Sequence, residues 1–122
     1  MRHHKTVKKL DRLAAARKAL WRTQMISLIF HKRMVTTPAK AKALRPKIEK
    51  LITKSRQPGL ATRRFLLRHL NQPRAVEELM TVIVPRQHQR PGGYTRIIPL
   101  SRRRRGDGAQ QVQIEIIDQA KL

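Results

Sequence analysis

Apolar residues recur at helical spacing over much of this 122-residue chain, and they predict several helices. The clearest stripe repeats with the period of an α-helix and consists of Ala41, Leu44, Ile48, Leu51 and Ile52. The other faces of this helix carry basic residues: Lys40, Lys47, Lys50 and Lys54. An earlier long helix is expected over residues 10–31, with a buried stripe formed by Ala14, Trp21, Met25 and Leu28.

Prolines mark where several helices should begin, bend or end. Thr37-Pro38 predicts a helix start, because a hydroxyl N-cap is followed by proline at the first helical position. Pro46 lies inside the clearest stripe, where it removes a backbone donor and is expected to kink the helix. A short helix is expected over residues 60–70. A last helix is expected to open at Pro73 and to end at Pro85, with one face formed by Val76, Leu79, Met80 and Ile83.

The final third of the chain changes to a period of two, which predicts strands. Val112, Ile114 and Ile116 alternate with polar residues, as in a half-buried strand. Residues 94–100 form an earlier extended stretch, and residues 102–108 form a turn, so we expect a C-terminal β-hairpin. Residues 33–37 are expected to add a short strand-like piece. These elements predict an α+β fold in which several helices pack on a short sheet.

The domain organisation follows from the absence of any repeat or of any Ser- or Gly-rich linker along the chain. Residues 10–122 are therefore expected to form a single domain. Residues 1–9 are basic and show no periodicity, which predicts an extended basic arm that orders on a partner.

Charge changes this picture more than any other property. The chain has 29 Lys and Arg against 7 Asp and Glu, a formal net charge of +22. A compact domain with this charge repels itself, so a polyanion is expected to lie over much of its surface. Residues 1–74 hold 21 basic and 2 acidic residues, whereas residues 75–122 hold 8 and 5. The polyanion should therefore meet mainly the first three fifths of the chain.

The residue types also limit the kind of partner and the chemistry. With only four aromatic residues, the chain is not expected to bind single strands through rows of stacked bases, and recognition of the backbone and shape of folded nucleic acid is favoured. The absence of cysteine excludes disulfides and Cys-based zinc sites. The five histidines have no convincing metal spacing, the acids are scattered, and no phosphate-binding glycine loop is present. We expect no cofactor, no small-molecule substrate and no enzymatic activity.

Most basic residues are expected to contact phosphates, with a solvated surface as the alternative for each group. The arm and the first helix supply Arg2, His3, Lys5, Lys8, Lys9, Arg12, Arg17, Lys18 and Arg22. Lys40 and Lys42 stand beside a helix N-terminus, which is a ready phosphate site. For Thr36 and Thr37, capping of the helix and contact with RNA are equally favoured roles. The helix over residues 60–70 supplies Arg63, Arg64 and Arg68.

The C-terminal part supplies a second set of candidates: Gly92, Gly93, Tyr94, Arg96, Arg102, Arg103, Arg104 and Arg105. The four consecutive arginines at the hairpin tip could form a localisation signal, a solvated loop or an RNA-contacting tip. RNA contact is favoured, because adjacent guanidinium groups repel one another unless phosphates intervene. For Trp21, packing in the core is favoured over stacking on a base. For Tyr94, the two roles are about equally favoured.

Several short motifs follow one another in a fixed order. The most specific are Gly92-Gly93-Tyr94-Thr95-Arg96-Ile97 and Arg105-Gly106-Asp107-Gly108-Ala109. The earlier ones are Met1-Arg2-His3, Lys9-Leu10-Asp11-Arg12, His31, Thr36-Thr37, Lys40-Ala41-Lys42, Leu44-Arg45, Glu49 and Leu51-Ile52-Thr53. In this order and spacing, the motifs resemble ribosomal protein seventeen of the bacterial large subunit over nearly the whole chain. The chain departs from the usual family pattern at Asp11, Ala16 and Lys32, and by Pro46 within the second helix.

The resemblance implies a structural component of the large ribosomal subunit, bound to rRNA near the outer end of the nascent-peptide tunnel and supporting assembly. It also implies a small α/β fold, no catalysis, one copy per ribosome, and neighbouring large-subunit proteins as partners. The start of the chain favours a bacterial cytoplasmic protein over an organellar one, and no membrane segment is expected. The alternative hypothesis, a DNA-compacting architectural protein, explains the charge equally well but not the ordered motifs.

Two stretches of the chain without basic residues predict which side of the protein faces away from RNA. Lys and Arg are absent from residues 75–85 and 106–120, and these stretches hold five of the seven acids. We therefore expect the fourth helix and the last strand to turn away from RNA, toward the core, solvent or a neighbouring protein.

Overall fold

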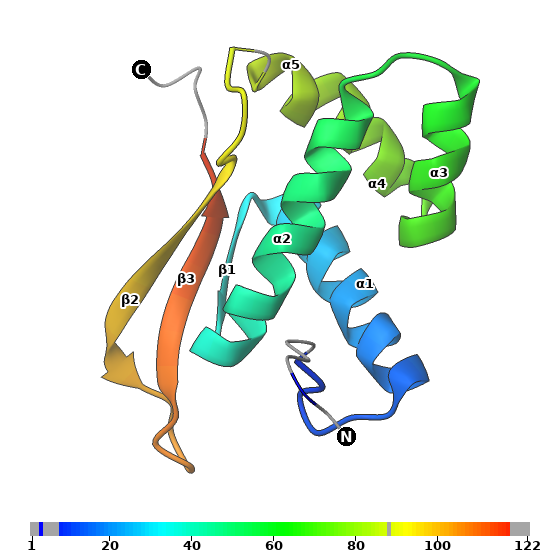
Figure 1. The fold of residues 1–122 in the computed structure, drawn as a ribbon. Helices are drawn as coiled ribbons and strands as arrows, with labels where there is room; N and C mark the ends of the chain where they lie inside the picture. The colour runs from blue at the N-terminus through cyan, green and yellow to red at the C-terminus, as the bar shows by residue number, and fades with distance from the viewer. Residues whose placement is uncertain (1–2, 4–7, 88, 118–122) are drawn as a thin grey trace.

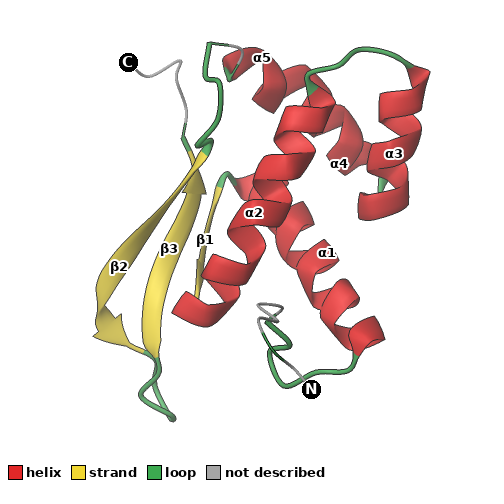
Figure 2. Cartoon of the chain, in the orientation of Figure 1, coloured by secondary structure: helices red, strands yellow, loops and turns green. Residues whose placement is uncertain are grey.

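The computed structural model describes residue 3, residues 8–87 and residues 89–117 (Figure 1). In chain order, its elements are α1 (Ala14–His31), β1 (Arg33–Thr36), α2 (Pro38–Ser55), α3 (Leu60–Leu70), α4 (Pro73–Glu78), a π-helical turn (Leu79–Ile83), α5 (Val84–Arg86), β2 (Thr95–Arg103) and β3 (Gln110–Ile116). Helices and a small sheet lie in separate layers (Figure 2), which confirms the predicted α+β class.

The sheet has three antiparallel strands in the order β1-β3-β2. The predicted hairpin of β2 and β3 is confirmed, and β1 completes the sheet on the other side of β3. Met34, Ile114 and Ile97 are register partners across the three strands. β2 runs to Arg103 and so extends past the predicted end at residue 100. Pro99 is tolerated because β2 is an edge strand and its pairing with β3 becomes irregular between Pro99 and Arg103.

Helix α2 stands at the centre of the molecule, between the sheet and the remaining helices (Figure 1). Its predicted apolar stripe is confirmed, since Ala41, Leu44, Ile48, Leu51 and Ile52 are all buried. The helix begins at Pro38, as predicted, and continues through Pro46 to Ser55 as one uninterrupted element. The core therefore consists of one cluster that joins α2 to α1, α3, α4 and β3.

The first helix starts later than its hydrophobic spacing predicts. α1 begins at Ala14, because Leu10 and Asp11 adopt left-handed backbone angles (φ 53° and 54°) that no right-handed helix accepts. Ala14 is exposed, so its predicted place in the buried stripe is wrong. Met25 and Leu28 are buried as predicted, and Trp21 is half-buried at the edge of the core.

The fourth helical segment also departs from its predicted form. It opens at Pro73 as expected, but a π-helical turn at Leu79–Ile83 interrupts it and the helix ends at Arg86, one residue beyond Pro85. A proline ring clashes with the carbonyl four residues earlier in a regular α-helix. The Val84 N–H instead bonds to the Leu79 carbonyl, five residues earlier, so the chain is already widened where Pro85 follows.

Replacing Leu44 by alanine should destabilise the protein by about 2–5 kcal/mol, because a fully buried leucine is removed from the contact between α2 and its neighbours. Leu60→Ala is the matched control, since Leu60 is 60% exposed and its loss should change stability by less than about 0.5 kcal/mol. Urea unfolding followed by circular dichroism measures both changes. Equal losses in the two variants would contradict the central role of α2.

Candidate nucleic-acid interface

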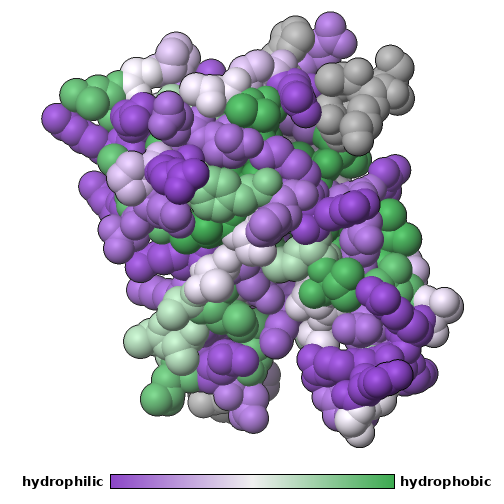
Figure 3. Space-filling view, turned by 180° about the vertical axis from the view of Figure 1, so that it is seen from behind, coloured by the Kyte–Doolittle hydropathy of each residue, from purple (hydrophilic) through white to green (hydrophobic). Residues whose placement is uncertain are grey.

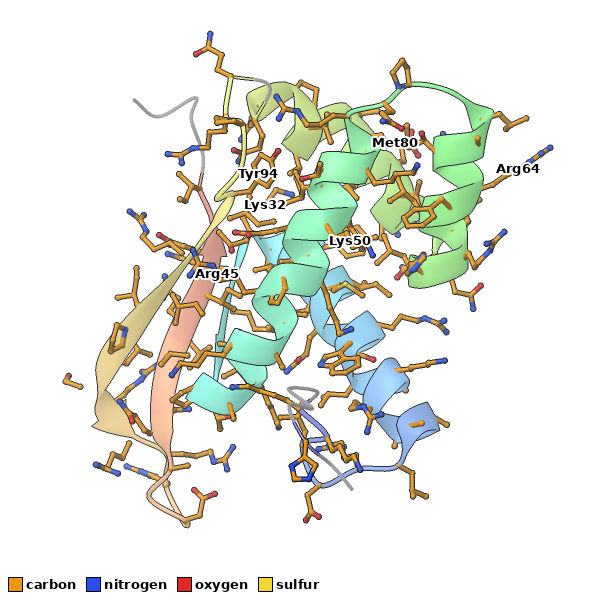
Figure 4. The ribbon with its side chains drawn as sticks, in the orientation of Figure 1. Lys32, Arg45, Lys50, Arg64, Met80 and Tyr94 are labelled. Atoms are coloured by element: carbon orange, nitrogen blue, oxygen red, sulfur yellow. The ribbon has the colours of Figure 1, made fainter. Side chains whose placement is uncertain are left out.

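The predicted phosphate-binding residues lie on the outside of three helical regions. Lys8, Lys9 and Arg12 precede α1 and are exposed. Further exposed members are Lys18 and Arg22 on α1, Lys42 on α2, and Arg63, Arg64 and Arg68 on α3, while Arg17 and Lys40 are half-buried. Arg64 points outward from α3 in Figure 4. Of the arm, His3 is exposed, whereas the predicted contacts Arg2 and Lys5 lie outside the described residues.

The N-terminus of α2 is close to its predicted form. Thr37 is the N-cap, and its carbonyl accepts a hydrogen bond from the Ala41 N–H at 3.0 Å. The Thr37 hydroxyl makes no capping hydrogen bond, so first-turn N–H groups of α2 keep no side-chain partner from the cap. Thr36, the last residue of β1, is half-buried beside it. This arrangement suits an anion held between the helix N-terminus and Lys40 and Lys42.

The four arginines at the hairpin are not equivalent. Arg102 and Arg103 end β2, while Arg104 and Arg105 lie in the turn. Arg104 is held by Asp107 through an ion pair, and the Arg103 guanidinium donates to the Gly108 carbonyl at 3.0 Å. Gly106 and Gly108 have positive φ angles (98° and 66°), which glycine adopts without strain. Arg102 and Arg105 are exposed, and the hydrophilic cluster at the lower right of Figure 3 is this tip.

Tyr94 is a correction to the predicted set. Its side chain is 1% exposed, and its hydroxyl accepts a hydrogen bond from Arg56 at 2.9 Å (Figure 4). The ring belongs to the core beneath the preceding loop, so it cannot stack on a base without opening that core. Gly92 and Gly93 are exposed just before it, and Gly93 has φ 63°. Arg96 is exposed but paired with Glu115 on the neighbouring strand.

Several acids tie together elements that are distant in sequence. Glu78 on α4 pairs with Lys32 at 2.7 Å, and Lys32 is the left-handed C-cap of α1 (φ 66°). Glu49 on α2 accepts a hydrogen bond from the Thr95 hydroxyl at 2.8 Å. These carboxylates are thus used within the fold. Neither contact can be predicted from the sequence, because each depends on how helices meet strands or one another.

A cationic cluster on α2 is not predicted as a site from the sequence, which indicates only that its lysines form a basic helix face. Lys47 lies over the Trp21 ring, with 3.9 Å between Nζ and the ring centroid. Burial, together with the charges of Lys50 and Arg17, lowers the pKa of Lys47. The helical spacing of Lys47, Lys50 and Lys54 was the available signal, but only the fold shows which aromatic ring faces it.

Two further kinds of site were sought among the residues that the structure describes. These residues contain no group of three or more His, Asp or Glu that could hold a metal ion. Among the helices of these same residues, none is both long enough and apolar enough to cross a membrane.

Comparisons with known proteins identify the family that this chain resembles. Residues 20–117 match the family described as "Ribosomal protein L17". The large ribosomal subunit protein bL17 of Thermus thermophilus is 43% identical over 118 residues, which cover 97% of this chain and all of that protein. The bL17 of Thermomicrobium roseum is 45% identical over 117 residues, covering 96% of this chain and 99% of the relative. The bL17 of Salinibacter ruber is 46% identical over 118 residues but extends further, since these cover 59% of its length.

The ion pair at the hairpin tip should be visible in the titration of Asp107. Hydrogen bonds from Arg104 and from the Ala109 N–H hold the pKa of this carboxyl well below its ordinary value of about 4. The carboxylate should therefore stay ionised as the pH falls through the ordinary range, and the turn should lose the pair only below it. Arg104→Gln should raise the Asp107 pKa toward the ordinary value, as measured by carboxyl-carbon NMR. Arg105→Gln is the control; an equal rise in this variant would contradict the assigned pair.

Proposed function

The chain belongs to the ribosomal protein L17 family, and we propose that it binds large-subunit rRNA by neutralising phosphates and supports assembly near the exit of the nascent-peptide tunnel. Like the relatives it matches, it is a structural constituent of the large ribosomal subunit, and it is not an enzyme. Its place is the ribosome of the bacterial cytoplasm. The observation that carries the rRNA proposal is the excess of 21 basic over 2 acidic residues in the first 74 positions.

The proposed mechanism is the joining of separate rRNA segments. α3 and the tip of the hairpin lie at opposite sides of the molecule (Figure 1), so the arginines of α3 and those of the tip would reach different phosphates. Lys40 and Lys42, with the N-terminus of α2, form a third contact, and the residues before α1 form a fourth. In this proposal residues 1–9 act as an extending arm, while residues 10–122 act as a single rRNA-binding domain.

The orientation proposed from the charge gaps needs one adjustment. α4 carries Glu77 and Glu78, and Glu78 is already paired with Lys32, which suits a face turned away from RNA. Gly106–Gly108, however, share the tip with Arg104 and Arg105, so this turn would approach RNA together with them. The proposal therefore keeps α4 and β3 away from rRNA and moves the turn to the RNA side. Neighbouring large-subunit proteins, with one copy of this chain per ribosome, are the proposed partners of the remaining surface.

Co-sedimentation tests the proposed place in the cell. The tagged chain, expressed in a bacterium, should remain with the large subunit through a high-salt wash, because many phosphate contacts from separate rRNA segments hold it. Its distribution should not change after DNase treatment. Recovery of the chain with DNA, and its release from the subunit by the wash, would favour a DNA-compacting protein and contradict the proposal.

Replacing Lys40 and Lys42 together by glutamine should weaken rRNA binding and flatten its dependence on salt. Each lost phosphate contact should reduce the slope of log affinity against log salt by roughly 0.7 to 0.9. Arg74→Gln is the control, because Arg74 is exposed at the start of α4 beside Glu77 and Glu78 and should leave the slope unchanged. Filter binding at several salt concentrations measures the slopes. An unchanged slope in the double variant would remove both lysines from the interface.

A further inference from the structure

A pocket of about 410 Å³ lies where α1, α2 and α3 meet. Its wall is apolar and partly aromatic, formed by Trp21, Met25, Leu51 and Phe65. The Phe65 ring contacts the ring of His69, which also lines the pocket, with 4.3 Å between the two ring centroids. His69 is itself anchored, because its Nδ1 lies 3.0 Å from the Phe65 carbonyl oxygen. The volume falls in the range of sites that hold one small molecule.

The rim of the same pocket is strongly cationic. Lys18 and Arg22 approach from α1, Lys47 and Lys50 from α2, and Arg68 from α3. No acid is among the described residues that line the pocket. Figure 4 shows Lys50 on the side of α2 that faces the other helices. Cations gathered from three elements without a carboxylate form a site for an anion.

Trp21 and Lys47 each have a polar group in this pocket whose interactions within the protein are unfavourable or missing. The Trp21 ring is half-buried, and its Nε1 is buried without a hydrogen-bond partner among the residues that the structure describes. Lys47 covers the ring, but its ammonium is partly removed from water and is repelled by Lys50 and Arg17. An anion at the rim would draw Lys47 toward itself and uncover the face of the indole ring.

We propose that this pocket takes a single unpaired nucleotide of the rRNA, with its base against Trp21 and its flanking phosphates between Lys18, Lys50 and Arg68. An apolar flat wall and a cationic rim match the two halves of a nucleotide, namely a planar base and a charged backbone. An unpaired base suits the site because it is already free of a partner strand and costs little to unstack. The inference rests on the proposed rRNA binding and adds to it one position where the base, and not only the backbone, is held.

Trp21 is the only tryptophan of the chain, so its fluorescence reports on this pocket alone. The full chain is titrated with large-subunit rRNA of Thermus thermophilus, and binding is measured in parallel by filter retention. A stacked base should quench the emission of Trp21, and the quenching should saturate at the same RNA concentration as binding. Inorganic polyphosphate serves as a probe without bases: it should draw Lys47 from the ring, but without a stacked base it should quench Trp21 less than the rRNA does. Equal quenching by both polymers would overturn the proposal, leaving a phosphate site only.

Variants separate the pocket from the rest of the interface. Trp21→Leu keeps an apolar side chain but removes the ring, and it should reduce rRNA affinity by about 5- to 150-fold with an unchanged salt slope. Arg64→Gln is the matched control, because Arg64 points away from the pocket; it should lower the slope and leave the saturating quenching of Trp21 intact. If Trp21→Leu fails to fold, as judged by circular dichroism, the wild-type quenching still decides the question.

The outcomes also distinguish this inference from the proposed function. Tight, salt-dependent rRNA binding without any change in Trp21 emission would overturn the nucleotide pocket and leave the proposed function standing. An absence of rRNA binding would overturn both. Quenching together with the loss of affinity in Trp21→Leu would support both.

Discussion

The burial of one apolar stripe on α2 holds this molecule together. The chain has few hydrophobic residues to bury against a large charge repulsion, since 39% of its residues are hydrophobic and its net charge is +22. Leu44, Ile48 and Ile52 are completely buried, and the helix that carries them contacts the sheet as well as α1, α3 and the π-helical turn. Because hydrophobic burial is the main force that opposes the mutual repulsion of the cations, every basic surface of the protein depends on this one helix.

Three carboxylates form ion pairs that join neighbouring parts of the fold at its surface. Lys32 and Glu78 join the end of α1 to α4, Arg96 and Glu115 join two strands, and Arg104 and Asp107 close the hairpin turn. Pairs this exposed contribute little stability individually. Their effect is electrostatic. A carboxylate that is paired within the fold does not compete with RNA phosphates for the remaining basic side chains. The surface that remains is basic from the residues before α1 to the hairpin tip.

The sequence predicts an element correctly wherever the residues of that element alone determine its secondary structure. The bounds of α3, the start of α2 and the alternation of β3 follow from spacing, capping and period. Spacing failed where other constraints act. The left-handed turn at Leu10 and Asp11 delays α1, and the pairing of β1 with β3 joins distant parts of the chain. The pocket at Trp21 could not be predicted because its wall and rim come from three helices that meet only in the folded protein.

The strand order has a consequence for the time course of synthesis. β1 and β2 are both edge strands, and each pairs only with β3, the last element of the described chain. Helices α1 to α3 can form from contacts that are already available while translation continues, but β1 must wait until β3 has been synthesised. The three-stranded sheet therefore cannot form before β3 has been synthesised. A product that ended before β3 would lack the partner strand that anchors the arginine tip, so the tip takes its form only after both β2 and β3 have been made.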